Sequence, residues 1–231
     1  MLNLKNVQDR MVQPLLIIAC GALAREIKAL KQANAWEFVH LHYLEADLHN
    51  HPEQIPARLQ ATIEQYKPDY AAIFVAYADC GTGGALDRVL AEAGVERLAG
   101  AHCYAFYAGQ QRFADLVDEE IGSFYLTDFL ARHFERLVVQ GLKLDRYPML
   151  KDEMFRHYQR VVYLAQTEDP SLLQLAQHAA AYLGLDFKHV HCGYGELAST
   201  LQQVVQQHYD RKSSDLLARY SVADYVEARS G

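Results

Sequence analysis

The stretch YAAIFVAYADCGTGG, residues 70–84, decides the fold predicted for this chain. It opens with an apolar run of the kind that forms a buried parallel strand, and it closes in a turn rich in glycine. Directly afterwards, the spacing of a helix face appears in Leu86, Val89, Leu90 and Ala93. The same order of strand, turn and helix recurs at residues 15–31 and 187–205, so the chain repeats one βα unit.

Further strands are predicted between these units, at residues 38–44, 95–98, 124–126 and 161–165. Each is followed by a helical pattern, and this alternation implies βαβ units. We therefore expect a doubly wound, Rossmann-like α/β fold, with a mostly parallel sheet and helices on both faces.

The predicted organisation is a polar segment at 1–12, an α/β domain at 13–208 and a helical tail at 209–231. The polar stretch 142–150 contains a proline and follows a long helical pattern. It is either a hinge between two lobes or an ordinary helix-to-helix loop.

The composition is that of a soluble globular chain: 231 residues, 51% hydrophobic and 22% charged. With 22 basic and 29 acidic residues the net charge is -7, which argues against nucleic acid as a partner. No apolar run approaches the roughly 20 residues of a membrane span, and the start lacks the apolar core of a signal peptide. We expect a cytoplasmic protein whose four cysteines are buried, catalytic or metal-bound, and not paired in disulfides.

Three cysteines follow predicted strands, where ligands bind in open parallel sheets. Cys20, Cys80 and Cys103 are expected to converge there and to hold zinc or an iron–sulfur cluster. No CxxC pair supports this, and two alternatives stay open. The cysteines could be nucleophiles, or small apolar residues that fill the core.

Two histidines and one aspartate complete the predicted chemistry. His49 follows the strand at 38–44 and His102 precedes Cys103, so either could be a metal ligand or a general acid or base. Asp79 would orient a ligand or move a proton.

Two turns are candidates for binding an anionic substrate or cofactor through backbone N–H groups. The first is formed by Gly81, Thr82, Gly83 and Gly84. A smaller one is formed by Gly193, Tyr194 and Gly195. The alternative is that short βα turns need glycine for their geometry, whatever they bind.

The first turn also resembles the glycine-rich loop of S-adenosylmethionine-dependent methyltransferases, through the string CGTG at 80–83. That family expects an acidic residue at the end of the next strand, and residues 95–100 have none there. The loop also lies in mid-chain, which is a second departure.

Five motifs fit together in order and spacing: ACGALAREI at 19–27, LHNHPE at 48–53, VAYADCGTGGALD at 75–87, HCYAFYAG at 102–109 and FYLTDFLARHF at 124–134. They resemble the uncharacterised prokaryotic family catalogued as domain of unknown function 1638, over about residues 15–201. The matching motifs include Cys20, His49, Asp79, Cys80, Gly81, Gly83, Gly84, His102, Cys103 and Asp128, whereas Cys192 lies outside them. Some members occur in organisms with corrinoid-dependent methyl transfer, so the resemblance implies one-carbon chemistry.

Together these observations predict a metal-dependent enzyme acting on a small anionic substrate, with the metal as Lewis acid. The expected reaction is methyl-group or other one-carbon transfer, or a lyase reaction. The alternatives are an S-adenosylmethionine-dependent methyltransferase and a non-catalytic metal- or corrinoid-binding module. The tail could pack on the body or form a homo-oligomer through Leu216, Leu217, Tyr220, Ala223 and Val226.

Overall fold

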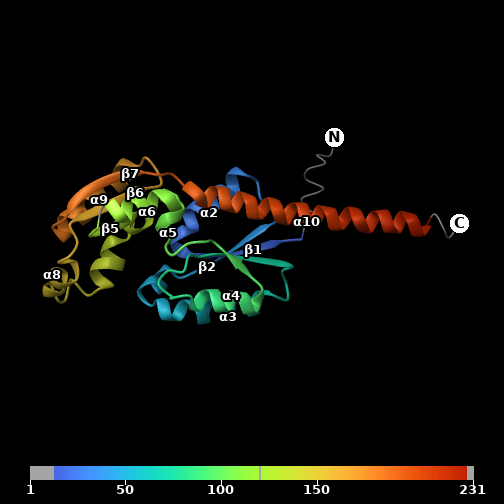
Figure 1. Ribbon diagram of the computed structural model, residues 1–231, viewed down its shortest axis with the longest axis horizontal. Coiled ribbons are helices and arrows are strands. Elements are labelled where there is room, and N and C mark those ends of the chain that lie inside the picture. The colour runs from blue at the N-terminus through green and yellow to red at the C-terminus, as the bar shows by residue number, and fades with distance from the viewer. Residues whose placement is uncertain (1–12, 120, 228–231) are drawn as a thin grey trace.

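The computed structural model describes residues 13–119 and 121–227, which form two separate parallel sheets, each with its own helices (Figure 1). The predicted polar segment 1–12 lies outside the described residues. The predicted α/β class, with parallel strands and helices on both faces, is confirmed. The strands are divided between two sheets, and we call each sheet with its helices a lobe.

The first lobe contains a four-stranded parallel sheet in the order β2-β1-β3-β4. Its strands are β1 (Leu15–Cys20), β2 (Val39–Leu44), β3 (Ala72–Ala76) and β4 (Glu96–Arg97). Its helices are η1 (Gly21–Leu23), α2 (Ala24–Ala33), η2 (Ala46–Asn50), η3 (Pro52–Gln54), α3 (Ile55–Tyr66) and α4 (Ala85–Ala93). The chain leaves β1 for β2 on one side and returns across β1 to β3 on the other. The carboxyl ends of β1 and β3 therefore border a topological switch point.

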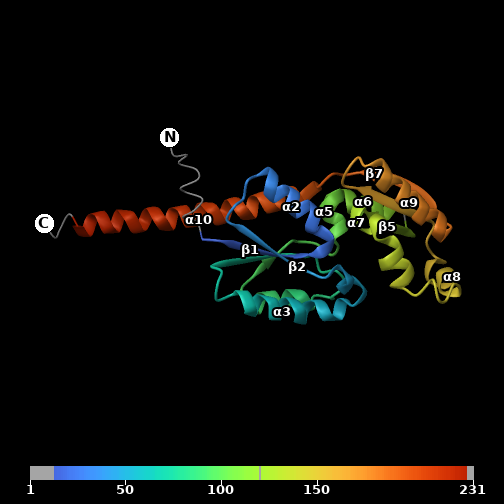
Figure 2. The ribbon, with the colours of Figure 1, turned by 180° about the vertical axis from the view of Figure 1, so that it is seen from behind.

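The central strand β1 is buried along its whole length, which explains its unbroken apolar sequence. In the views of Figures 1 and 2, α3 and α4 cover one face of this sheet and α2 covers the other. The amphipathic pattern of α2 places Ile27 and Leu30 in the core, as the sequence spacing predicts.

The second lobe contains the sheet β5-β6-β7, again fully parallel. Its strands are β5 (Ser123–Thr127), β6 (Arg160–Ala165) and β7 (Asp186–His191), and its helices are α7 (Asp128–Arg132), the π-helix η4 (Glu135–Gln140), α8 (Met149–Phe155) and α9 (Pro170–Leu183). Alternate residues of β6 face different helices, as the two-residue period of a strand requires. Val161, Tyr163 and Ala165 pack with α7 and α9, and Val162 and Leu164 pack against residues of α5 and α6.

Two segments join the lobes. One contains α5 (Cys103–Ala108) and α6 (Gln110–Glu119), and the other leads from β7 into α10 (Gly195–Glu227). Leu197, Leu201 and Val205 of α10 return to the core of the first lobe. The candidate hinge at 142–150 instead lies between β5 and β6, inside the second lobe, so it does not separate the two sheets.

The end of α10 extends past the first sheet in both views (Figures 1 and 2). Its backbone is helical to Glu227, within the predicted tail. The side chains of Leu216, Leu217, Tyr220, Ala223 and Val226 lie outside the described residues, so their predicted packing is untested. In the ranges that the structure describes, no helix combines the length and apolar character needed to cross a membrane.

Gly195 allows α10 to start against α5, and this generates a first prediction. A Cβ at this position would lie 2.3 Å from the carbonyl oxygen of Tyr107, at a backbone φ of +46°. We expect Gly195→Ala to lower the free energy of unfolding by roughly 3 kcal/mol, by backbone clash and strain together. Gly184→Ala is the control, because its φ is +72° but no atom lies within 4 Å of the added Cβ, so only about 1 kcal/mol is expected. Equal losses in urea denaturation would contradict the clash.

Candidate functional site

The switch point of the first sheet brings two of the predicted cysteines together. Cys20 is the last residue of β1, and Cys80 lies in the turn that follows β3. Parallel pairing sets Ala19 beside Ala76, so both strands end at the same edge. Cys103 opens α5 on the segment that leaves β4. The three thiols therefore come from three different connections.

His49 joins this group from η2, which follows β2. Its Nδ1 lies 3.8 Å from Cys20 Sγ and 3.0 Å from the carbonyl oxygen of Ala46. Cys80 is also close enough to the ring to raise its pKa. Burial disfavours the charged ring, but the interactions with Cys20 and Cys80 outweigh that effect and raise the pKa of His49 far above its usual value.

The pKa of the Cys80 thiol is lowered by its neighbours. The hydrogen bond from Cys103 is the largest cause, and the hydrogen bond and charge of His49 add to it, so the pKa of Cys80 falls to about 5 although burial opposes this. The pKa of Cys103 moves well above its usual value because its proton is held by Cys80. The pKa values of the two thiols shift in opposite directions because each acts on the other, and this favours the thiolate on Cys80.

The backbone of Cys80 is also unusual, because its φ is +51°, in the left-handed region that non-glycine residues seldom adopt. Its N–H donates to Ala101 at 2.9 Å, and that of Asp79 donates to Gly100 at 3.1 Å, which fixes the turn. A reactive side chain on a strained turn between a strand and a helix is also the geometry of the nucleophile elbow in α/β-hydrolases.

Two tyrosines at this site were not predicted from the sequence. Tyr77 is fully buried just after β3, where burial and the charge of Cys20 raise its pKa. Burial and the charge of Cys103 likewise raise the pKa of Tyr104. The only signal in the sequence was that Tyr77 ends an apolar run and that Tyr104 follows Cys103.

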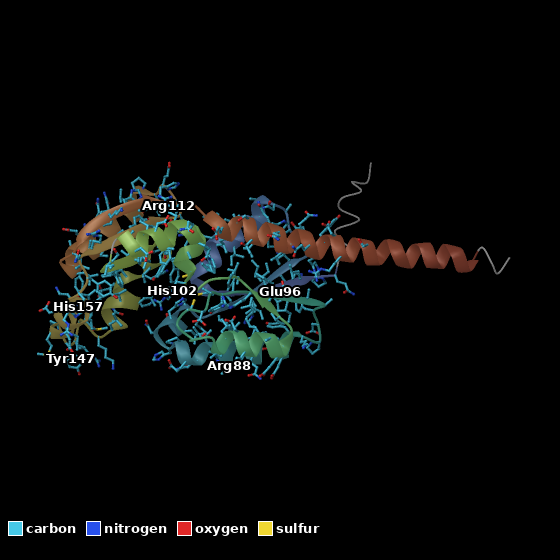
Figure 3. The ribbon with its side chains drawn as sticks, viewed as in Figure 1. Arg88, Glu96, His102, Arg112, Tyr147 and His157 are labelled. Atoms are coloured by element: carbon cyan, nitrogen blue, oxygen red, sulfur yellow. The ribbon has the colours of Figure 1, made fainter. Side chains whose placement is uncertain are left out.

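The remaining candidates for metal binding do not complete a ligand set. Within the described part of the chain, no group of three or more His, Cys, Asp or Glu side chains is arranged to hold a metal ion. His102 is exposed (Figure 3). It acts on Cys80 through its charge, which helps to lower the pKa of that thiol. Cys192 lies apart in the second lobe, where its thiol donates to Ala165 at 3.2 Å and burial raises its pKa to about 11.

The first glycine-rich turn is closed by its own aspartate, which corrects the prediction of an anion cradle. The N–H groups of Gly83 and Gly84 donate to the Asp79 carboxylate at 3.1 and 2.9 Å, and the Thr82 hydroxyl donates to it at 2.5 Å. These bonds lower the pKa of Asp79, the Thr82 bond most. Asp79 therefore caps the turn, which replaces its predicted role in moving a proton. Gly81 gives the turn a left-handed backbone conformation, with a φ of +85°.

The second turn also has a structural role. The N–H of Gly193 donates to the carbonyl oxygen of Ala165 at 3.2 Å, and Gly195 lies against α5. Tyr194, between them, lies close enough to Glu26 and Asp128 for their charges to raise its pKa, after burial. The turn therefore connects the lobes. Its predicted role in cofactor binding lacks the Gly193 N–H as a donor, because that group is already bonded to Ala165.

A cavity of about 260 Å³ lies between the lobes beside the thiols. Its polar lining contains His49 and Cys103 of the site, together with Asn50, Tyr104 and Thr127. The rest of the lining is apolar and comes from both lobes: Ala22, Ala46, Phe124, Phe129, Leu130, Leu137, Val138 and Leu142. The site can therefore bind a small molecule with a substantial apolar part next to His49 and Cys103.

Asp128, a residue of the family motifs, holds the second-lobe side of this cavity. It is 3% exposed, and its carboxylate accepts hydrogen bonds from Tyr163, Thr167 and the backbone of Gln166 at 2.7, 2.6 and 3.0 Å. Its own N–H donates to the Gln166 side chain at 2.7 Å. Because every bond ties the start of α7 to the end of β6, Asp128 positions the helix that carries Phe129 and Leu130.

The fold and the site define a two-lobed α/β protein with a thiol and imidazole cluster at its switch point. The chain belongs to the family described as protein of unknown function (DUF1638), whose model matches residues 43–201, which confirms the resemblance. No curated protein matches it.

Among solved structures the chain is similar to ornithine carbamoyltransferase from Pyrococcus furiosus, with 16% identity and a TM-score of 0.27. The match covers 79% of this chain and 56% of that one, so the chain spans little more than half of that structure. The likeness carries no argument about activity.

The cap formed by Asp79 gives a second prediction. Asp79→Ala should leave the N–H groups of Gly83 and Gly84 without their acceptor and lower the free energy of unfolding by about 2 kcal/mol. Asp87→Ala is the control, because its carboxylate is mostly exposed and Arg97 keeps its bonds to the carbonyl oxygens of Leu98 and Gly100, so a loss of only about 1 kcal/mol is expected. Thermal unfolding measures both. An Asp79 variant as stable as the Asp87 variant would show that the cap is dispensable.

Proposed function

We propose that this protein is an enzyme that uses the Cys80 thiolate as a nucleophile on a small electrophilic substrate. The observation that carries the proposal is the position of His49, whose Nδ1 lies 3.8 Å from Cys20 Sγ at the edge where Cys80 also lies, together with a pKa of Cys80 that Cys103 and His49 lower to about 5. Thiolates, and not thiols, are nucleophiles, and a neighbouring imidazolium is the usual way in which proteins stabilise them.

The proposed reaction begins with attack of Cys80 Sγ on an electrophilic carbon of the substrate. A sulfur–carbon bond forms, and the bond from that carbon to the leaving group breaks with its electron pair on the leaving group. His49, charged in the resting site, donates its proton to the departing atom and becomes neutral. Water or a second substrate would then attack the same carbon, give its proton to the neutral His49 and release Cys80 as a thiolate, which restores the resting site.

The cavity supports this assignment by its position and its lining. His49 and Cys103 form part of its wall, so a bound molecule would contact the partners of Cys80 directly. The apolar side chains from both lobes would exclude water around the reacting atoms, which strengthens the electrostatic effect of a charged pair.

A metal centre is the second candidate, favoured by the convergence of further donor groups on the same point. Cys20 lies on the other side of His49, so Cys20, Cys80, Cys103 and His49 are a set suited to zinc or an iron–sulfur cluster. The described side chains would have to rotate to form such a set. In that case the centre would supply a Lewis acid, and the one-carbon or lyase chemistry would follow from it.

The other expectations rank lower as proposals. A methyltransferase using S-adenosylmethionine would need free amides in the first glycine turn, where Asp79 occupies two of them. A metal- or corrinoid-binding module without catalysis, and a homo-oligomer formed by the tail, stay predictions. A cytoplasmic location fits the four free cysteines, which need a reducing compartment.

The low pKa of Cys80 makes a direct prediction about pH. Alkylation by iodoacetamide should rise with pH around a midpoint near 5 at Cys80, because the thiolate is the reactive form. At Cys192 it should rise only toward pH 11, which provides an internal control. Peptide-resolved mass spectrometry after timed alkylation distinguishes the two sites.

The same measurement tests His49. His49→Ala removes the positive partner, so the Cys80 midpoint should move up toward about 8.5, the value of a free thiol. His157→Ala, at the far end of the second lobe, should leave the midpoint unchanged (Figure 3). A native midpoint already near 8.5 would rule out the thiolate pair.

Metal analysis separates the two candidates. For the nucleophile we expect less than about 0.1 metal ion per chain after anaerobic purification, and Cys20→Ser should keep Cys80 reactive. For the metal centre, Cys20→Ser, Cys80→Ser and Cys103→Ser would each deplete bound metal and lower thermal stability, whereas Cys192→Ser would change neither. One metal ion per chain, together with that pattern of losses, would support the metal centre and contradict the nucleophile.

A further inference from the structure

The wall of the cavity between the lobes contains a hydroxyl without a protein partner, that of Tyr104. This residue lines the cavity together with Cys103 and His49, and no described residue forms a hydrogen bond with its hydroxyl. The side chain is half-buried, and its oxygen is not among the fully buried oxygens that lack a partner. The hydroxyl is therefore open to solvent, and it has no bond that a ligand would need to displace.

The other nitrogen and oxygen groups of the lining are engaged or lie at the surface. His49 holds a backbone carbonyl oxygen at 3.0 Å through Nδ1, and it already acts as the acid of the proposed reaction. The Thr127 hydroxyl accepts the N–H of Leu130 at 3.3 Å and so caps α7. Asn50 is exposed. Tyr104 is thus the donor of this lining that is both half-buried and uncommitted.

Two aromatic neighbours fix the ring of Tyr104. Its centroid lies 6.1 Å from that of Phe113 in α6 and 5.8 Å from that of Tyr125 in β5, and these two rings lie 5.0 Å apart. All three rings pack against the buried cluster that contains Val162 and Leu164 of β6. A donor on a fixed ring does not have to be ordered when charge develops on a substrate, so it stabilises that charge efficiently.

The backbone places Tyr104 near the proposed nucleophile. The N–H of Cys80 donates to the carbonyl oxygen of Ala101 at 2.9 Å, so the turn that carries Cys80 lies against the segment leading into α5. Because α5 begins at Cys103, Tyr104 lies in its first turn. Burial and the charges of Cys103 and Cys80 raise the pKa of Tyr104, so its hydroxyl keeps its proton and is a donor at neutral pH.

We infer that Tyr104 is a catalytic residue whose hydroxyl donates a hydrogen bond to an oxygen on the carbon that Cys80 attacks. Such an oxygen gains negative charge when a thiolate adds to a carbonyl carbon, and a fixed donor stabilises it. The substrate class is therefore an ester, thioester or amide, with an apolar body that contacts the cavity wall at Phe129 and Leu130. This inference rests on the proposed function, because it specifies the electrophile of that reaction.

The inferred reaction is an acyl transfer to Cys80. As the sulfur–carbon bond forms, one electron pair of the carbonyl group moves onto its oxygen, where Tyr104 binds it. The pair returns to restore the carbonyl group as the bond to the leaving group breaks with its electrons on that group, which takes the His49 proton. Tyr104 keeps its own proton throughout, since its hydroxyl only donates a hydrogen bond.

The test compares two reagents, of which only one passes through a charged carbonyl oxygen. p-Nitrophenyl acetate transfers its acetyl group to the Cys80 thiolate and releases p-nitrophenolate. Iodoacetamide instead alkylates Cys80 by displacement of iodide from a methylene carbon. Tyr104→Phe removes the hydroxyl and keeps the ring, so it should slow acetylation of Cys80 about tenfold and leave alkylation unchanged. Peptide-resolved mass spectrometry measures both rates at Cys80.

The control removes a hydroxyl elsewhere. Tyr147→Phe should leave both rates unchanged, because Tyr147 is exposed at the far end of the second lobe (Figure 3). Acetylation that Tyr104→Phe does not slow, or an equal slowing of both reactions, would overturn the inference while leaving Cys80 as the nucleophile. A native Cys80 that reacts with neither reagent would instead overturn the proposed function.

A reversible carbonyl compound tests the same hydrogen bond in the native protein. Benzaldehyde adds to a thiolate, and with the proton of His49 it forms a thiohemiacetal that cannot react with iodoacetamide. It should therefore protect Cys80 from alkylation more than benzyl alcohol does, and Tyr104→Phe should remove most of that difference. Equal protection by benzaldehyde and benzyl alcohol in the native protein would contradict a carbonyl substrate.

Discussion

The site depends on one constraint, the reversal of strand order around β1. The chain places β2 on one side of β1 and β3 on the other, so their connections diverge and leave a crevice at the carboxyl ends. Cys20 and Cys80 border this crevice because each follows one of the two flanking strands. His49 reaches it from the connection after β2. Without this reversal, the same residues would lie at strand ends that are not neighbours.

The electrostatics of the site follow from placing a small number of charges in a partly buried environment. A thiolate on Cys80 is costly to bury alone, and the Cys103 proton and the His49 charge offset that cost. The pKa of Tyr77 is raised instead, since a further negative charge beside Cys20 and Cys80 is unfavourable. The strained backbone of Cys80 persists because Asp79, Gly100 and Ala101 hold the turn on both sides.

The second lobe turns this thiol cluster into a binding site. Its sheet contributes no cysteine to the cluster, but β5, α7 and η4 supply most of the apolar wall of the cavity. The buried Asp128 network fixes the start of α7, and the Arg136–Asp47 pair connects the same region to η2. The lobes are joined by 98–122 and by the turn before α10, so both connections pass beside the site.

The sequence by itself determined the local elements, and it predicted that Cys20, Cys80 and Cys103 follow parallel strands with His49 or His102 beside them. Apolar runs and three- and four-residue spacings are local, and the carboxyl ends of parallel strands share an edge. Only the tertiary structure decided that there are two sheets, that Asp79 occupies the amides of Gly83 and Gly84, and that Phe129 and Leu130 line a cavity between the lobes. These features depend on contacts between residues far apart in the chain, or on which of several acceptors a donor selects. Neither leaves a period or a spacing in the sequence.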